Sequence, residues 1–426
     1  MKSLFLISLL MLLFGLVSER LHRTIFTPPM VFVAVGLAVG AGVFGSFESY
    51  DGAELTHLLA EITLVVVLFT DASRIRLTEL EKDFKLPLRL LGVAMPLTIL
   101  LGTVVAYLLF DDLTFWGAAV VATVLAPTDA ALGQAVVSSA IVPARIRQAL
   151  NVESGLNDGL AVPLVLVTIA LASVMGGAGT TSYWASFTLK QILLGPLVGI
   201  GVGYIGGKLV ERGARAHWMT HSFQQLSALA LALIAYLGAE QIGGNGFIAA
   251  FTAGLTLANA ASGVCGVLQE FAETEGQLLA LLTFLCFGAH LIWPVIGEID
   301  GTMILYALLS LTVIRMVPVA LSLLGSGLLP VTYGFLGWFG PRGLATILFA
   351  SLVIEHEVPG GEQIYLVALT TALLSVFLHG LTAWPGAKLY SRRCRTVEEE
   401  REMAEHLPAA ETPVRIRLRE PAEPVG

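Results

Sequence analysis

Charged residues are scarce in this sequence: only 13% of its 426 residues are Asp, Glu, Lys or Arg. Soluble domains carry about 25% charged residues, so the composition excludes an ordinary soluble protein. Hydrophobic residues make up 56% of the chain, and its mean hydropathy is +0.81. At about twenty residues per membrane-spanning helix, the length allows roughly a dozen spans. The composition therefore predicts an all-α polytopic membrane protein.

Cysteines are few, and a signal-peptide cleavage site is lacking. The chain has only three cysteines, Cys265, Cys286 and Cys394. Their wide separation excludes a disulfide framework and the close spacing of a zinc site. The apolar stretch 3–18 is followed directly by Glu19 and Arg20 rather than by the small residues of a cleavage site. We therefore expect a retained first span, with a cleaved signal peptide as the alternative.

Apolar runs divide the chain into about thirteen predicted transmembrane helices, separated by clusters of charged or turn-forming residues. The cores of these segments are 3–18, 28–44, 56–72, 87–109, 114–137, 150–175, 187–208, 223–240, 245–263, 277–296, 302–326, 330–354 and 363–385. We assign residues 1–390 to one transmembrane domain. Residues 391–426 are charged and contain several prolines, which predicts a mostly disordered cytoplasmic tail.

Basic residues concentrate in every second connection between these segments, which predicts the orientation of the chain. They follow the first, third, fifth, seventh and thirteenth segments, whereas most of the other connections are acidic or neutral. We therefore expect a multi-pass protein of the cell membrane with its N-terminus outside and its C-terminus in the cytoplasm. One connection departs from this pattern, because Glu270, Glu273 and Glu275 lie on the predicted cytoplasmic side.

Three carboxylates interrupt the fifth and sixth segments: Asp129, Glu153 and Asp158. In a bilayer, each such group costs several kcal/mol unless it is paired, protonated or hydrated. Asp129 follows Pro127 and Thr128, and proline breaks a helix by removing a backbone donor. A simple proline kink, with Thr128 bonding the freed backbone, is the alternative. That alternative leaves the carboxylate unexplained, so we expect a functional break in the fifth segment.

The sixth segment carries a polar strip near its start. At helical spacing, Glu153 and Asn157 share one face, and Ser154 and Asp158 share the adjacent face. Their carboxylate, hydroxyl and amide oxygens are ligands suited to a hard cation. A capping cluster at a helix start is the alternative, but Asp158 lies about two turns into the segment, beyond the reach of a cap. We expect a direct role for Asp158 and Ser154, and a structural ion pair for Glu153.

The twelfth segment contains a second break, Gly340-Pro341-Arg342-Gly343. It lies seven segments after the first break, as expected if the first six and the last six segments form two inverted repeats joined by the seventh. Broken helices at matching places in two repeats are typical of a transport site near the middle of the membrane. The sequence therefore predicts two inverted repeats with helices 5 and 12 broken.

Two arginines in the membrane segments offset part of this negative charge. Arg315, in the middle of the eleventh segment, must face protein and be paired, and we interpret it as a structural counter-ion. Its partner is open between Asp71 and another acid. Arg315 and Arg342 give two positive charges against the three carboxylates of the fifth and sixth segments, a sum that leaves out Glu61. One negative charge remains, which either a proton or a monovalent cation could neutralise.

Two other features have plainer explanations. The glycines at 201–206 match a dinucleotide fingerprint but lie within a membrane run, where close helix packing is the better explanation. His290 and His379 are single histidines in apolar segments, and we interpret them as hydrogen-bonded core residues rather than proton relays. Either one beside Ser154 would suggest an intramembrane enzyme, but no serine-protease motif surrounds Ser154.

At these residues the chain resembles the cation/proton antiporter superfamily, and within it the electroneutral sodium/proton exchanger branch (NhaP-like). The matching motifs are Thr128-Asp129 in the fifth segment, Glu153-Ser154 and Asn157-Asp158 in the sixth, and Gly340-Pro341-Arg342-Gly343 in the twelfth. The resemblance covers nearly the whole membrane part and leaves out the tail after Arg395. Pro341 departs from the motif of many relatives, which puts the local backbone path in question.

The resemblance implies a secondary antiporter that exchanges Na⁺ (or Li⁺) for H⁺ by alternating access and serves pH homeostasis. The alternatives are a K⁺/H⁺ antiporter, or a channel or solute symporter on the same fold. Such proteins are homodimers in the lipid bilayer. We expect no cofactor besides the transported Na⁺ and H⁺, no enzymatic activity and no nucleic-acid partner.

The resemblance also assigns roles to the site residues. The Na⁺ would be held by the side chains of Asp129, Asp158 and Ser154 and by the backbone carbonyl of Thr128. Asn157 resembles the electroneutral branch, in which one cation is exchanged for one proton.

The same resemblance implies an ion pair between Glu153 and Arg342. This pair, together with Arg315, would support the site without binding the cation.

Overall fold

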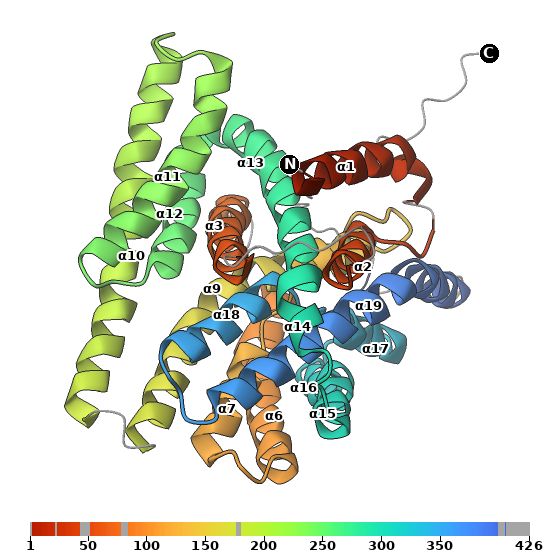
Figure 1. The fold of residues 1–426 in the computed structure, drawn as a ribbon. Coiled ribbons are helices and arrows are strands. Elements are labelled where there is room, and N and C mark those ends of the chain that lie inside the picture. The colour runs from red at the N-terminus through yellow and green to blue at the C-terminus, as the bar shows by residue number, and fades with distance from the viewer. Residues whose placement is uncertain are drawn as a thin grey trace.

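A computed structural model describes residues 2–21, 24–42, 52–77, 84–175, 180–398 and Glu405. Within these residues all regular secondary structure is helical, with no strand (Figure 1). The helices, including two π-helical turns η1 and η2, are α1 (Lys2–Leu21), α2 (Pro28–Gly40), α3 (Gly52–Ser73), α5 (Lys85–Arg89), η1 (Leu90–Ala94), α6 (Met95–Leu109), α7 (Phe115–Val124), α8 (Ala130–Val137), α9 (Ala144–Met175), α10 (Thr181–Arg215), α11 (His221–Gln241), α12 (Gly246–Ala260), α13 (Ser262–Cys286), η2 (Phe287–Ile292), α14 (Trp293–Val295), α15 (Gly301–Leu311), α16 (Val313–Ser322), α17 (Pro330–Trp338), α18 (Leu344–Glu355) and α19 (Gly361–Glu398). Each predicted segment coincides with one of these helices or with consecutive ones, which confirms the all-α polytopic fold.

Eight helical stretches of the described residues are long and apolar enough to cross a membrane. Five are the single helices α3, α9, α10, α11 and α19, and three are the joined stretches α5–η1–α6, α13–η2–α14 and α15–α16. Shorter apolar helices of 10 to 17 residues include α2, α7, α12 and α18. The side of the membrane that each end faces stays a prediction.

The two predicted breaks are confirmed. The fifth segment forms α7 and α8 with non-helical residues 125–129 between them, and the twelfth forms α17 and α18 around residues 339–343. Pro127 and Pro341 lie in these two gaps. The missing proline N–H therefore leaves no helical hydrogen bond unmade at either place.

Several helices begin before their predicted starts, among them α9 and α13. α9 begins at Ala144 rather than near residue 150, and α13 begins at Ser262 rather than near residue 277. The acidic residues that departed from the charge pattern thus lie on α13. Glu273 forms an ion pair with Arg74, which directly follows α3. The predicted starts lie next to charged residues. They miss these turns because a charged residue that is paired is tolerated within a helix.

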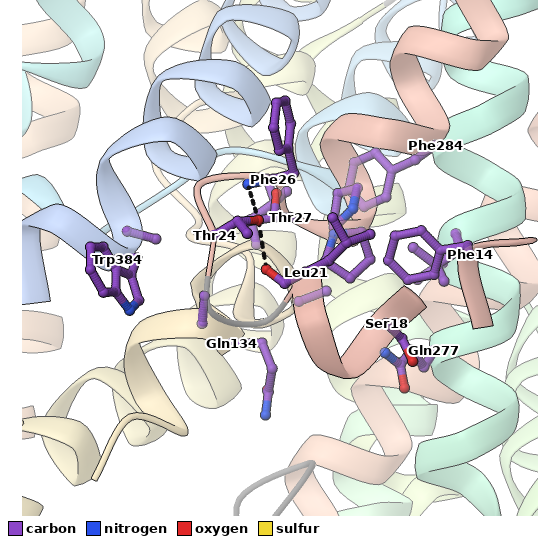
Figure 2. A pocket seen from close by; sticks show the side chains of 18 of the residues that line it. Phe14, Ser18, Leu21, Thr24, Phe26, Thr27, Gln134, Gln277, Phe284 and Trp384 are labelled. Atoms are coloured by element: carbon purple, nitrogen blue, oxygen red, sulfur yellow. Dashed lines mark hydrogen bonds between the residues drawn. The ribbon is translucent and has the colours of Figure 1, made fainter. Parts of the chain in front are cut away.

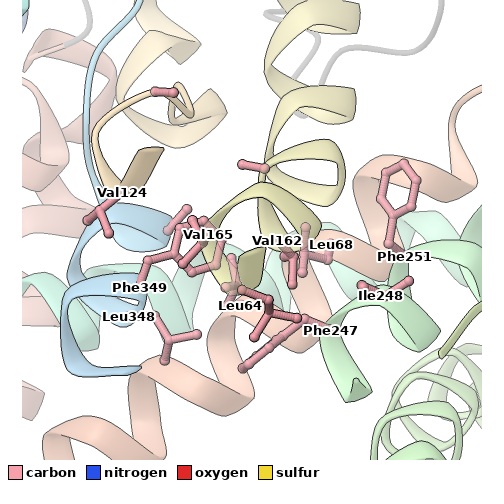
Figure 3. Packing of buried hydrophobic residues seen from close by; sticks show 14 of the residues in the cluster. Leu64, Leu68, Val124, Val162, Val165, Phe247, Ile248, Phe251, Leu348 and Phe349 are labelled. Atoms are coloured by element: carbon pink, nitrogen blue, oxygen red, sulfur yellow. The ribbon is translucent and has the colours of Figure 1, made fainter. Parts of the chain in front are cut away.

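The helix α9 lies in the middle of the largest apolar cluster. Its Val162 and Val165 are fully buried, in the same cluster as Leu64 of α3, Phe247 of α12 and Phe349 of α18 (Figure 3). Lipid tails are as apolar as these side chains, so tight packing rather than exclusion of water stabilises the arrangement. This packing fixes the helix that carries the polar strip of the sixth segment.

The glycine motif at 201–206 lies within α10 and serves helix packing. A methyl group at Gly203 would overlap the Ala253 carbonyl oxygen of α12, and one at Gly206 would overlap Leu231 of α11. A methyl group at Gly201 would meet open space. Two of these three glycines therefore let α10 approach α11 and α12, which run beside it in Figure 1.

The C-terminal region continues as a helix beyond the predicted domain boundary, because α19 ends at Glu398. Glu405 is also described and is buried. Its carboxylate accepts hydrogen bonds from Leu329 N at 2.7 Å and from Thr332 Oγ1 at 2.8 Å, at the start of α17. The other residues after Glu398 lie outside the described part, so the disorder of the tail and the domain division stay predictions.

Candidate ion-binding site

The two broken helices meet at Asp129. Its backbone N–H donates to the Pro341 carbonyl oxygen at 2.8 Å. Its carboxylate Oδ2 accepts from the N–H of Leu344, the first residue of α18, at 2.7 Å. A methyl group at Gly343 would overlap this carboxylate, so the chain passes Asp129 at a distance that requires glycine. The breaks of the fifth and twelfth segments are therefore in direct contact.

The Asp129 carboxylate also caps α8. Its Oδ1 accepts from the N–H groups of Ala131 and Leu132 at 2.7 and 3.2 Å. Asp129 thus lies at the N-termini of α8 and α18 at once. Free amides and the positive ends of two helix dipoles stabilise a negative charge there. This arrangement offsets the cost of a carboxylate that is only 6% exposed.

Arg342 binds the part of the first break that follows α7. Its Nη1 donates to the carbonyl oxygens of Ala126 at 2.6 Å and Pro127 at 3.0 Å. These carbonyls follow the C-terminus of α7, where no helical N–H remains to bond them. The guanidinium is fully buried, and its positive charge stabilises the negative end of the α7 dipole.

Glu153 pairs with Arg315 and not with Arg342. Arg315 Nη2 lies 2.8 Å from Glu153 Oε1, and both side chains are buried. The expected Glu153–Arg342 pair is therefore wrong, because the Arg342 guanidinium bonds the carbonyl oxygens of the first break and Arg315 of α16 reaches Glu153 instead. The prediction that Arg315 faces protein and is paired is confirmed, and the acid is Glu153 rather than Asp71.

Thr128 joins the first break to the polar strip of α9. Its Oγ1 lies 3.1 Å from Ser154 Oγ and accepts from Asn157 Nδ2 at 2.6 Å. All three side chains are buried. Among the described residues, none donates a hydrogen bond to Asn157 Oδ1, so this amide places a buried acceptor oxygen near Thr128.

Asp158 lies one turn after Ser154 on α9 and is also buried. Because α9 begins at Ala144, the polar strip starts about two and a half turns inside the helix. The capping alternative for the strip is therefore wrong. A methyl group at Gly159 would enter the Phe251 ring of α12, so α9 and α12 approach closely beside Asp158.

The hydrogen bonds of the described residues do not join Ser154 to a histidine. Ser154 shares its bond with Thr128, whereas His379 bonds Ser375 and the Trp338 carbonyl oxygen. The interpretation of His379 as a hydrogen-bonded core residue is confirmed. The part of the chain that is described also contains no group of three or more His, Cys, Asp or Glu side chains that could hold a metal ion.

A pocket opens beside α8 (Figure 2). Ala131 and Leu132, whose amides bind the Asp129 carboxylate, form part of its wall. The rest of the wall comes from other residues of α8 and from α1, the connection before α2, the start of α2, α13 and α19. Its polar lining residues are Ser18, Thr24, Thr27, Gln134, Glu273 and Gln277. The pocket therefore brings open space close to one side of the first break.

A family of known proteins matches this chain over the whole region that forms the site. The family described as "Sodium/hydrogen exchanger, transmembrane" matches residues 6–388. The chain belongs to the sodium/hydrogen exchanger family. The match to the exchanger family includes both broken helices, α9 and most of α19.

Proteins similar to this chain are named for different cations. The "K(+)/H(+) antiporter NhaP2" of Shewanella oneidensis is 27% identical over 377 residues, which cover 84% of this chain and 62% of that protein. The "Na(+)/H(+) antiporter 2" of Zygosaccharomyces rouxii is 26% identical over 367 residues, which cover 81% of this chain and 45% of that protein. The chain thus matches less than two thirds of the length of either relative.

A solved structure of another protein has the same fold. The sodium proton antiporter MjNhaP1 from Methanocaldococcus jannaschii matches 92% of this chain and 100% of its own length, with a TM-score of 0.73 and 20% identity. At that identity the likeness concerns the fold. It confirms the polytopic helical architecture on which the site is built.

Proposed function

We propose that this chain is a secondary antiporter that exchanges a monovalent alkali cation for a proton by alternating access. One observation carries the proposal: a buried carboxylate, Asp158, lies one turn from Ser154 where α9 meets the first of two crossing broken helices. Broken helices in a membrane supply helix ends and backbone carbonyls to transported ions. Family membership supports the same conclusion.

The charges around the site support exchange of one cation for one proton. Glu153 and Arg315 neutralise each other. Asp129 and Arg342 lie at helix ends whose dipoles offset their charges. We assign to Asp158, the buried carboxylate of the polar strip, the role of binding either a proton or a cation, but not both at once. Because each occupant excludes the other, a gradient of one can drive transport of the other.

The proposed ligands are all oxygen atoms. We assign the cation to the carboxylates of Asp158 and Asp129, the hydroxyl of Ser154 and the backbone carbonyl of Thr128. Asn157 Oδ1 is a further acceptor beside this group. Hard cations prefer carboxylate, hydroxyl and carbonyl oxygens.

The preferred substrate of the proposal is Na⁺ or Li⁺, and K⁺ is the second candidate. Relatives named for Na⁺ and for K⁺ exchange match this chain at 26% and 27% identity, so the comparison favours neither cation. Discrimination between them depends on the size of the oxygen cage around Asp158.

The test is proton flux in proteoliposomes that carry the purified full chain and a pH-sensitive dye. Na⁺, Li⁺ and K⁺ are added one at a time over a pH series. We expect Na⁺ or Li⁺ to dissipate an imposed pH gradient. Moving one net charge across a potential of 100 mV changes the free energy by about 2.3 kcal/mol, so a transporter that moves net charge responds to an imposed membrane potential. An electroneutral exchanger moves no net charge, and its rate should stay the same. K⁺ as the strongest substrate would select the second candidate.

Cation flux that is independent of the pH gradient would contradict antiport and favour a channel. Flux that requires a co-transported solute would favour a symporter. Choline in place of the alkali cation, and vesicles without protein, are the matched controls.

The proposal includes a homodimer in the lipid bilayer. The outer face of α10 exposes apolar side chains along its length, which suits either lipid or a second copy. These exposed residues include Leu189, Leu193, Leu197, Ile200 and Tyr204. Chemical cross-linking in membranes is expected to trap a dimer, and a monomer at every protein density would contradict this part of the proposal.

A further inference from the structure

Three polar side chains follow one face of α19, the last membrane helix. Ser375, His379 and Thr382 are spaced by four and three residues, which places them on the same side of the helix. Ser375 and His379 are completely or almost completely buried. Buried polar groups cost free energy unless they are hydrogen-bonded, so their partners indicate what they stabilise.

These side chains bond two residues at the crossover of the second broken helix, residues 339–343: Trp338, just before it, and Arg342, within it. His379 Nε2 lies 2.8 Å from the Trp338 carbonyl oxygen, just before the crossover. A carbonyl only accepts, so this nitrogen carries the proton. His379 Nδ1 then accepts from the Ser375 hydroxyl at 3.1 Å, although the Ser375 carbonyl oxygen also lies 3.0 Å away. The Ser375 hydroxyl oxygen, Oγ, accepts from the Arg342 backbone N–H at 2.6 Å.

The Trp338 side chain adds further contacts between the end of α17 and α19. Its ring stacks on the His379 imidazole, with centroids 5.1 Å apart and an interplanar angle of 26°. Its Nε1 donates to Thr382 Oγ1 at 2.9 Å. The end of α17 is therefore held to α19 through both the backbone and the side chain of Trp338.

The crossover that α19 holds in this way also holds Asp129. Between the two attachment points, Pro341 O accepts from Asp129 N, and directly beyond them Leu344 N donates to the Asp129 carboxylate. The Arg342 side chain bonds the carbonyls of the first break. Ser375 and His379 thus act one contact away from the groups that orient Asp129.

We propose that Ser375 and His379 are positioning residues of the ion site, and that they set its cation affinity by fixing the crossover 339–343. They touch neither the cation nor the transported proton. The inference rests on the proposed exchange activity and adds residues that the charges of the site do not reveal.

The test compares His379→Leu with His379→Gln in the proteoliposome flux assay. Leu leaves the buried Trp338 carbonyl without a donor, which is expected to raise the KM for the alkali cation about tenfold. The Gln side chain retains an N–H donor near the position of Nε2, so its KM should stay within about twofold to threefold of wild type. Ser375→Ala removes the acceptor for Arg342 N and should raise KM in the same direction.

Two matched controls change the same residue types elsewhere in the membrane region. His290→Leu replaces a histidine of η2, and Ser351→Ala removes a hydroxyl of α18 that donates only to Ile347 O of its own helix. Both controls are expected to keep the wild-type KM.

The outcomes separate this inference from its rivals. A raised KM in His379→Leu with near-normal values in His379→Gln and both controls supports positioning. A wild-type KM with only less folded protein means a merely structural role and overturns the inference. A pH profile shifted equally in the Leu and Gln variants means proton relay by His379 and also overturns it. If the wild-type chain shows no cation-driven flux, the proposed exchange itself fails, and the inference falls with it.

Discussion

Asp158→Asn is expected to abolish cation-driven proton flux while leaving the protein folded. Asparagine keeps the size of the side chain and one oxygen, but it carries no negative charge and does not exchange a proton in its place. Glu153 is paired with Arg315, and Asp129 is held by two helix N-termini, so neither is positioned to replace Asp158. Flux should fall to the level of protein-free vesicles, with an unchanged elution profile and Tm in detergent.

Asp112→Asn is the matched control for this prediction. Asp112 is exposed in the turn between α6 and α7, so the same chemical change there should leave exchange unaltered. Full exchange by Asp158→Asn would contradict its assignment as the carrier. Loss of exchange in both variants would mean that flux responds to any lost carboxylate, and that the site has not been identified.

Glu153→Gln is expected to destabilise the protein strongly. The change leaves the Arg315 guanidinium buried next to a neutral amide, and breaking a buried ion pair from one side costs about 3–5 kcal/mol. Arg315 also lies against the second break, because a methyl group at Gly340 would overlap its guanidinium. We expect a clearly lower Tm in detergent and reduced accumulation in the membrane.

The double variant Glu153→Gln with Arg315→Met should recover much of this loss, because it removes both charges together. Glu211→Gln is the control, since Glu211 pairs with the more exposed Lys208 and Arg215 at the end of α10 and should lower Tm less. An unchanged Tm in Glu153→Gln would show that Arg315 does not depend on this carboxylate.

Much of the fold follows from the sequence. Apolar runs of about twenty residues mark the membrane helices, and their order places the two breaks seven segments apart. Pro127 and Pro341 identify those breaks because proline removes a helical donor. The polar strip of α9 can be identified from the sequence because an ionisable side chain within the membrane costs free energy and is therefore rare outside functional sites.

The contacts between distant helices do not follow from these local patterns. Arg315 and Arg342 are both buried, and the one that reaches Glu153 depends on how α16 is rotated and on the path of the crossover. Arg342 instead bonds carbonyls that a break more than two hundred residues earlier leaves free.

Ser375 and His379 escape a search for costly charges because neither needs a formal charge to act. Their spacing of one helical turn on the last segment is the signal that points to them. Only the position of the crossover beside α19 shows what they bond. The starts of α9 and α13 are missed for a related reason, since charges at a helix end look like the end of a segment.

We propose that one site holds either a proton or a cation, with Asp158 as the group that exchanges them. It is tested most directly by measuring proton release when alkali cation is added to the purified chain in weakly buffered detergent, together with calorimetric cation binding. We expect each bound cation to release at most one proton, most completely where Asp158 is protonated beforehand, and we expect Asp158→Asn to release none. Cation binding to the wild-type chain without proton release at any pH would contradict it.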